Sequence, residues 1–168
     1  MRREKIQDIT YVALCTAVLA VISQLAIPVG VVPLTLQTYA VALIGYFLGL
    51  RRGLITVGIY IALGALGAPV FAGFGAGMGV LLGYTGGFIF GYIPYVLLTS
   101  IKGTRVSRIA NGTVGLLLCH TAGAIQYMLL SSLDFVTAIM AVSVPFLLKD
   151  IILTVLAFFT SEAIKKRI

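Results

Sequence analysis

Charged residues are scarce in this chain of 168 residues. Asp, Glu, Lys and Arg make up 10% of it, and hydrophobic residues make up 60%. Soluble domains carry about a quarter charged residues on average, and a soluble domain of this size cannot bury so much apolar surface. The low charge therefore excludes a soluble globular protein and indicates that lipid is the solvent for most of the surface.

Cysteine is rarer still. Cys15 and Cys119 both lie inside apolar runs, as is typical of small core residues, so they say little about the redox compartment. A cleavable signal peptide is not evident, because the first apolar run is long enough to span a membrane and lacks a clear small-residue cleavage site.

Several functional motifs are missing. No Gly-Lys pair is followed by Ser or Thr, which excludes a Walker A loop and ATP use by that route. The sequence GAGMG at residues 75–79 resembles part of a dinucleotide-binding turn, but residue 80 is Val and a βαβ context is missing. Paired carboxylates, metal-ligand clusters and nucleophile–base pairs are also missing, so we expect neither an enzyme nor a cofactor.

Long apolar runs are present instead. A membrane-spanning helix needs about 20 apolar residues at ~1.5 Å each, so the chain has room for about six spans and no soluble domain. The runs do not alternate apolar and polar residues, which disfavours β-barrel strands. We therefore expect an all-α integral membrane protein with a single domain over residues 1–168. Its six transmembrane helices are expected near residues 6–27, 34–50, 54–66, 86–101, 109–130 and 145–164.

The net charge of +7 comes from basic residues in the breaks between apolar runs. They lie before the first span, between the second and third, between the fourth and fifth, and after the sixth; Lys149 is the exception. Because Lys and Arg are enriched in cytoplasmic loops, both termini are expected in the cytoplasm of a multi-pass cell-membrane protein. The charges are not interleaved with polar, base-stacking surface, so nucleic acid is not an expected partner.

Two segments on the expected outer side are unusual. Residues 32–38 (VPLTLQT) are uncharged but carry three polar side chains, and residues 67–87 are dense in glycine. A segment this rich in glycine is not expected to be a regular helix throughout. Non-helical backbone at membrane depth is tolerated where it is buried in protein or lines a cavity. The glycine-rich segment is also rich in Val, Phe, Met and Leu, which argues against a flexible linker. It is interpreted as a lid or cavity lining, with docking against a partner as an alternative.

Ionisable residues inside apolar spans are costly and point to functional sites. Asp150 and Lys149 lie near the outer end of the last span. Adjacent helix residues point about 100° apart, so we expect these two to meet different parts of one ligand rather than pair. The alternative is that Lys149 extends to the lipid headgroups. His120, in the fifth span, is interpreted as a neutral imidazole bonded to a neighbouring helix, and Asp134 as a solvated loop residue.

The first span carries Ala13 and Ala17, small residues one helical turn apart. Such a pair lets helices approach closely in lipid. It is compatible both with packing inside the bundle and with docking of a partner protein.

Five segments in this order resemble the biotin-specific substrate-binding components of energy-coupling factor transporters, the BioY family: residues 32–38 (VPLTLQT), 48–53 (LGLRRG), 67–73 (GAPVFAG), 82–88 (LGYTGGF) and 145–150 (PFLLKD). The resemblance spans nearly the whole chain. It implies a prokaryotic six-helix bundle that binds biotin from outside. It also implies docking on a transmembrane coupling component and two cytoplasmic ATPases, with Ala13 and Ala17 as docking residues.

The resemblance also implies a biotin site. Asp150 is expected to accept from the ureido N–H groups, with Gln37 or Thr35 completing that set. Phe71, Phe74 and Tyr39 suit the thioether ring. For the valerate carboxylate the candidates are Lys149, the Tyr84 hydroxyl and backbone N–H groups of the glycine-rich segment, Gly73 among them.

Two positions depart from the family pattern. The family often has a lysine one turn after the aspartate, where this chain has Leu153. Tyr84 stands where the family commonly has proline or another residue. Alternative functions are a component for another vitamin, riboflavin or thiamine, a ligand-free membrane scaffolding protein, and a small intramembrane enzyme.

Overall fold

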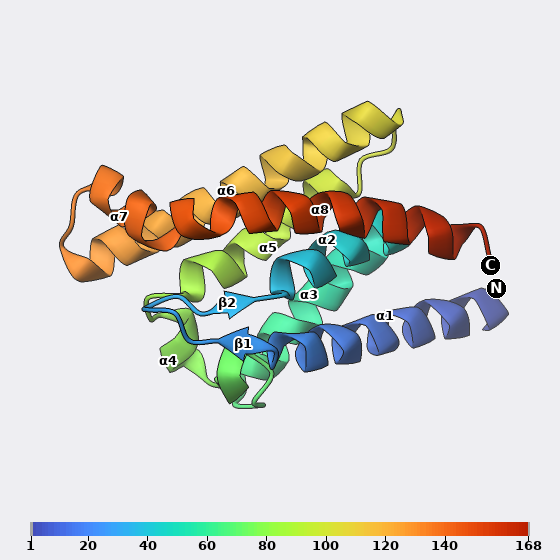
Figure 1. Ribbon diagram of the computed structural model, residues 1–168. Helices are drawn as coiled ribbons and strands as arrows, with labels where there is room; N and C mark the ends of the chain where they lie inside the picture. Colours follow the sequence, from blue (N-terminus) through green and yellow to red (C-terminus); the bar gives the residue numbers. More distant parts are fainter. Residues whose placement is uncertain (1, 168) are drawn as a thin grey trace.

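The computed structural model describes residues 2–167, with side chains from residue 4 onward. Met1 and Ile168, the ends of the predicted domain, lie outside the described residues, as do the side chains of Arg2 and Arg3. The described chain is a helical bundle (Figure 1). Its long helices are α1 (Arg2–Ser23), α2 (Gln37–Leu48), α3 (Leu50–Ala65), α5 (Gly86–Thr99), α6 (Arg105–Ser131) and α8 (Val144–Lys165).

Short elements join the long helices. Strands β1 (Ala26–Ile27) and β2 (Leu34–Thr35) pair antiparallel between α1 and α2. The 3-10 turn η1 (Ala72–Phe74) and α4 (Met78–Leu81) lie between α3 and α5, and α7 (Phe135–Val142) lies between α6 and α8.

Each of the six predicted runs overlaps a long helix, but several boundaries differ. The first, third and fifth helices begin at Arg2, Leu50 and Arg105, about four residues before the predicted starts. The first helix ends at Ser23 rather than near residue 27, and the second begins at Gln37 rather than near residue 34. The intervening residues include Pro28 and Pro33. Proline lacks an N–H donor and disfavours helical backbone in the residue before it, so this segment forms the β1–β2 pair.

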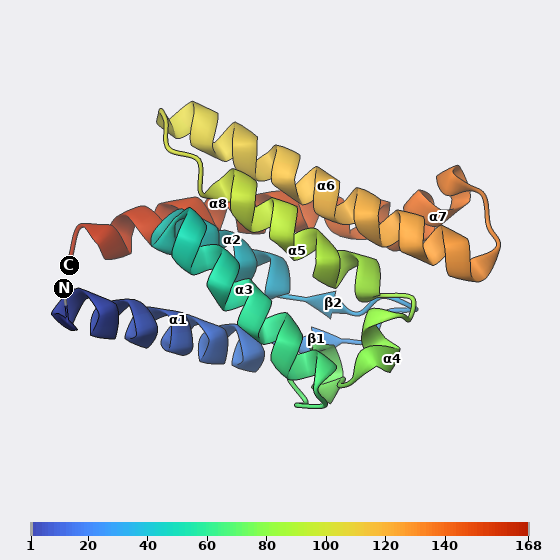
Figure 2. The same ribbon diagram turned by 180° about the vertical axis from the view of Figure 1, so that it is seen from behind.

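Length and composition identify α1, α6 and α8, among the described residues, as helices able to cross a membrane, with α2 and α5 as shorter apolar helices. The helices pair along their lengths: α5 on α6, α2 on α8 and α1 on α3 (Figure 2). A Cβ atom on Gly91 of α5 would lie 2.7 Å from the Cys119 Cα of α6, so the glycine permits this close approach.

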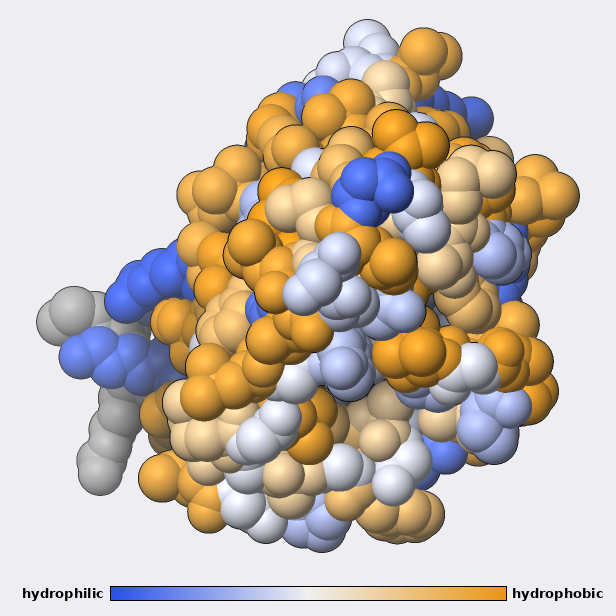
Figure 3. Space-filling model, turned by 90° about the vertical axis from the view of Figure 1, so that its left-hand side faces the viewer, coloured by the Kyte–Doolittle hydropathy of each residue, from blue (hydrophilic) through white to orange (hydrophobic). Residues whose placement is uncertain are grey.

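Figures 1 and 2 place the first turn of α1 and the last turn of α8 at the same end of the bundle. We call this the terminal end. The opposite end, which we call the distal end, carries the β1–β2 pair, α4 and α7. Figure 3 views the distal end, where hydrophobic residues still dominate the surface.

Apolar side chains face outward along the bundle while many polar side chains are buried. Large exposed residues include Leu14, Ile59, Phe90, Leu118 and Ile152. Buried polar residues include Ser23, Thr56, Thr99, Thr154 and Ser161. Because threonine and serine hydroxyls bond back to helix carbonyls, these groups are satisfied inside the bundle. This distribution fits a protein whose outer surface meets lipid.

The glycine-rich segment is folded rather than linker-like. Phe71 is 1% exposed, and its ring meets the Tyr60 ring edge-on at 5.5 Å. The Gly77 N–H donates to the Gly64 carbonyl at 2.7 Å, and a Cβ on Gly64 would collide with the Phe71 ring. The prediction that this segment is not a continuous helix is confirmed, since it consists of turns, η1 and α4.

Asp134 lies at the surface, as expected, but also caps α7. Its carboxylate accepts from the Thr137 hydroxyl at 2.7 Å and from the Thr137 N–H at 3.0 Å. These hydrogen bonds lower the pKa of Asp134.

Candidate ligand-binding site

A cavity of about 230 Å³ lies at the distal end of the bundle. Its walls come from the β1–β2 connection, β2, the start of α2, the glycine-rich segment, α5, α7 and the start of α8. Most of the lining is apolar. The lining residues are Val32, Pro33, Thr35, Gln37, Phe71, Ala72, Val80, Thr85, Phe88, Ile89, Tyr92, Val142, Phe146, Lys149 and Asp150.

Asp150 provides the buried negative charge of the cavity and is 3% exposed. Its Oδ1 accepts from the Thr38 hydroxyl at 2.5 Å and lies 2.7 Å from Lys149 Nζ. Its Oδ2 lies 3.3 Å from His120 Nε2. A buried carboxylate needs a paired cation and hydrogen-bond donors, and these three neighbours supply both.

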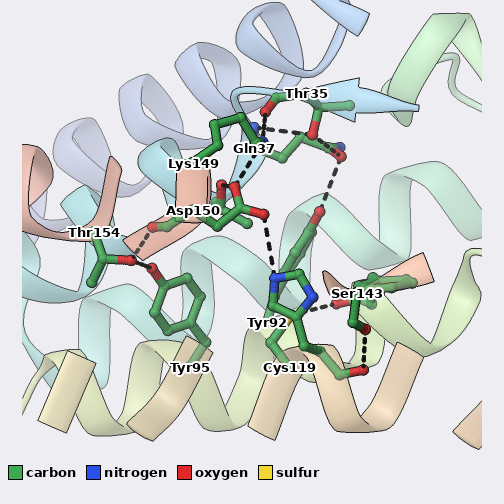
Figure 4. A network of polar contacts seen from close by, with 12 residues as sticks. Thr35, Gln37, Tyr92, Tyr95, Cys119, Ser143, Lys149, Asp150 and Thr154 are labelled. Carbon is green, nitrogen blue, oxygen red and sulfur yellow. Dashed lines mark hydrogen bonds and ion pairs between the residues drawn. The ribbon is translucent and has the colours of Figure 1, made fainter. Parts of the chain in front are cut away.

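Lys149 does pair with Asp150, contrary to the expectation from their adjacent positions on the helix. The Cβ directions of neighbouring residues diverge, but the long lysine side chain folds back so that Nζ reaches the carboxylate. Nζ also donates to the Thr35 carbonyl at 2.7 Å, which links α8 to β2 (Figure 4). The side chain is 26% exposed and lines the cavity rather than extending to the surface.

Gln37 is fixed by hydrogen bonds on both sides of its amide. Its Nε2 donates to the Ser23 hydroxyl at 3.0 Å and to the Tyr60 hydroxyl at 2.8 Å. Its Oε1 accepts from Tyr92 at 3.0 Å and from Thr35 at 3.4 Å. These four bonds use both donors and both lone pairs of the glutamine amide. They connect α2 with α1, β2, α3 and α5 at the cavity wall.

The structure brings five of the predicted ligand residues to the cavity lining: Thr35, Gln37, Phe71, Lys149 and Asp150. Their convergence comes from three separate segments of the chain. Two of these segments, residues 32–38 and 145–150, were singled out in the sequence for their polar groups.

Four predicted residues lie outside the lining. The Tyr39 hydroxyl donates to Thr160 of α8 at 3.1 Å, because residues 37 and 39 point to opposite sides of α2. Phe74 is 70% exposed, and Tyr84 is 47% exposed with its ring against Tyr127. Gly73 lies in the η1 turn with a φ of 61°, a conformation that favours glycine.

Sequence reasoning did not select the α5 side of the cavity. Thr85, Phe88, Ile89 and Tyr92 all line it. Their spacing of three, four and seven residues places them on one face of a helix, so helical periodicity would have identified them as a set. Val142 and Phe146, around the start of α8, were missed as well.

Ala13 and Ala17 line a separate groove of about 650 Å³ between α1 and α3. Their small side chains leave space between the two helices, and the α3 side of the groove is formed by Ile55, Ile59 and Leu63. The groove opens on the outer, apolar surface of the bundle.

Comparison with known proteins identifies relatives along the whole chain. The BioY2 biotin transporter of Lactococcus lactis subsp. cremoris is 35% identical over 161 residues, which cover 93% of this chain and 88% of the relative. The BioY biotin transporter of Thermotoga maritima is 38% identical over 155 residues, which cover 90% of this chain and 91% of the relative.

The fold also matches a solved structure. The crystal structure of the S-component for biotin from an ECF-type ABC transporter superposes with a TM-score of 0.92 at 24% identity. The match covers 99% of this chain and 94% of that one, so this chain has the fold of that S-component. A family model for the BioY family matches residues 1–168, and the chain belongs to the BioY family.

Proposed function

We propose that the distal cavity binds biotin and that the chain is the substrate-binding component of an energy-coupling factor transporter for biotin uptake across the cell membrane. The observation that carries the proposal is a buried carboxylate, Asp150, beside a cation, Lys149, in a cavity with mostly apolar walls. Relatives named as biotin transporters match nearly the full chain, which supports the same assignment.

The chemistry of biotin fits the three parts of the cavity. Its ureido group has two N–H donors, one of which suits Asp150 Oδ2, the carboxylate oxygen that accepts from no hydroxyl among the described residues. Its thioether ring suits the aromatic wall formed by Phe71, Phe88 and Tyr92. Its carboxylate suits Lys149, whose third N–H is not used by Asp150 or by the Thr35 carbonyl.

Gln37 and Thr35 are assigned a supporting part in this site. The Gln37 amide already makes four hydrogen bonds inside the protein, so we assign it to holding Tyr92 and β2 in place. A side chain held in this way loses little freedom when the ligand binds, which favours high affinity.

Binding to the purified protein in detergent tests the proposal directly. Calorimetric titration with biotin should give saturable binding, desthiobiotin should bind more weakly because it lacks the thioether ring, and riboflavin should not bind. Without saturable biotin binding at micromolar concentrations the proposal fails, and riboflavin binding would favour the same architecture with another vitamin.

We further propose a single domain of six spans, with the terminal end in the cytoplasm. Basic residues gather in the segments next to that end, such as Arg51, Arg52, Lys102 and Arg105, which supports this orientation. The short helices α2, α3 and α5 complete the six spans alongside α1, α6 and α8.

Cysteine labelling tests the orientation. In a background without Cys15 and Cys119, Val29→Cys reports the distal end and Lys102→Cys the terminal end, both at exposed positions. A membrane-impermeant maleimide should label Val29→Cys in intact cells. It should label Lys102→Cys only after the cells are permeabilised. The reverse pattern would invert the topology.

The α1–α3 groove is proposed as the surface that docks on the transmembrane coupling component, which in turn joins two cytoplasmic ATPases. Small residues at Ala13 and Ala17 allow a partner helix to approach closely. The larger side chain of Ala17→Leu fills the groove, and such overpacking is expected to weaken binding of the coupling component by ~1.4 kcal/mol. Co-purification with the coupling component should therefore fall roughly tenfold. Biotin binding should remain unchanged because the cavity is lined by other residues.

Ala110→Leu is the matched control for this test. Ala110 is exposed on α6 and lies outside the groove, so the same enlargement there should leave co-purification intact. If both changes reduce co-purification equally, or Ala17→Leu has no effect, the groove is not the docking surface.

A further inference from the structure

His120 is a buried ionisable residue that makes none of the proposed contacts with biotin. It lies on α6, is 4% exposed and is the single histidine of the chain. Its Nε2 lies 3.3 Å from Asp150 Oδ2, and its Nδ1 is buried without a hydrogen-bond partner among the described residues. The 3.3 Å contact is not aligned as a hydrogen bond, whereas both contacts to Asp150 Oδ1 are shorter.

The imidazole lies behind the cavity wall rather than in it. The Phe88 ring meets it edge-on at 5.6 Å with an interplanar angle of 90°, and Phe88 lines the cavity, whereas His120 does not. The His120 carbonyl accepts from the Ser143 hydroxyl at 3.3 Å, where α7 meets α8. The Phe88 ring thus packs against the imidazole and Ser143 fixes the backbone of His120. Direct contact with a ligand is not expected, because the imidazole does not line the cavity.

The two carboxylate oxygens of Asp150 have different surroundings. Oδ1 accepts from Thr38 and from Lys149, whereas Oδ2 has the imidazole as its neighbour. Thr38 and Lys149 restrain Oδ1, and the imidazole restrains the freedom that remains to Oδ2, because the last torsion of an aspartate has a broad energy profile. The other ionisable or polar groups around this pair are Thr38 of α2, Tyr92 and Tyr95 of α5, Cys119 of α6 and Lys149 of α8. None of them holds Oδ2.

We propose that His120 is a positioning residue: a neutral imidazole, protonated on Nε2, that holds Asp150 Oδ2 in the orientation in which it accepts the ureido N–H of the ligand. This inference rests on the proposed function. Hydrogen bonds at a site often tighten when the ligand binds, so the Nε2–Oδ2 contact is expected to become a full hydrogen bond in the complex. A carboxylate oxygen has room for both donors, the imidazole and the ligand.

Two substitutions at one position separate the donor from the bulk of the side chain. His120→Gln retains a side-chain N–H donor at a similar distance from the backbone. His120→Leu replaces the imidazole with an apolar side chain that has no donor. Biotin affinity measured by calorimetry should fall about tenfold or more in His120→Leu and stay within about threefold of wild type in His120→Gln, because hydrogen bonds to charged groups are the strong ones.

A double-mutant cycle shows whether His120 acts through Asp150. In the Asp150→Asn background, His120→Leu should cause little further loss of biotin affinity. The same loss in both backgrounds, or unchanged affinity in His120→Leu, would overturn the proposal, because a residue that merely stabilises the fold acts independently of Asp150.

Spectroscopy of the wild-type chain provides a readout that does not depend on variants. Since the chain has one histidine, labelling with ¹⁵N-histidine in a protein purified without a histidine tag gives one imidazole to follow by NMR. We expect the Nε2-protonated tautomer, with both nitrogen signals shifting on addition of biotin. If calorimetry shows biotin binding and the imidazole signals do not move, the role of His120 is disproved. If wild-type protein does not bind biotin, the proposed function fails instead.

Discussion

The Asp150→Asn substitution is expected to weaken biotin binding at least tenfold. The change removes the negative charge and replaces one acceptor oxygen with an N–H₂ donor, which faces the ureido donors of the ligand. Loss of a hydrogen bond to a charged group costs about 1.5–3 kcal/mol, or roughly 10- to 150-fold in affinity. Calorimetric titration of the purified variant with biotin measures the loss.

Asp134→Asn is the matched control, since Asp134 lies at the surface and caps α7 outside the cavity. It removes the same charge and should leave biotin affinity unchanged. Wild-type affinity in Asp150→Asn would remove this residue from the site. Equal losses in both variants would indicate a general effect of net charge.

The Lys149→Met substitution is expected to lower stability as well as biotin affinity. The substitution removes the cation that pairs with Asp150, so the buried carboxylate is left without it. Breaking a fully buried ion pair costs about 3–5 kcal/mol. Because Lys149 is 26% exposed and water screens part of the pair, we expect roughly 1–3 kcal/mol here. Thermal unfolding in detergent should shift down by several degrees, and Lys102→Met, at an exposed position, should shift it little.

The double variant Lys149→Met with Asp150→Asn separates stability from binding. Removing the unpaired charge should restore most of the lost thermal stability, because both members of the ion pair are then neutral. Biotin affinity should stay low, since neither ligand-facing group is present. If Lys149→Met is as stable as wild type, the pair does not stabilise the fold.

The long helices were predictable because their cause is local in the sequence. Apolar runs with basic residues in alternate breaks correspond to α1, α2, α3, α5, α6 and α8, and α1, α6 and α8 are long enough to cross lipid. The β1–β2 pair was not predicted, because two-residue strands have no periodicity to detect. Their pairing is a tertiary contact between Ala26 and Thr35 across the proline-containing turn.

The site was predictable where polar groups interrupt apolar runs. Asp150, Lys149, Gln37 and Thr35 are conspicuous for that reason, and they converge at the cavity. The aromatic wall was not predictable in the same way, because Phe88 and Tyr92 resemble ordinary core residues of a span. Whether a side chain points inward depends on helix rotation and turn geometry, and these place Tyr39 and Phe74 elsewhere.

The β1–β2 pair has a consequence for the residence time of the ligand. Its connection and β2 form one wall of the cavity, and the link from Lys149 to the Thr35 carbonyl holds this wall against α8. A pair of two-residue strands is marginally stable by itself, whereas the surrounding helices are packed along their lengths. The rate at which this short hairpin opens, rather than the rate at which any helices separate, should therefore set the dissociation rate of the ligand.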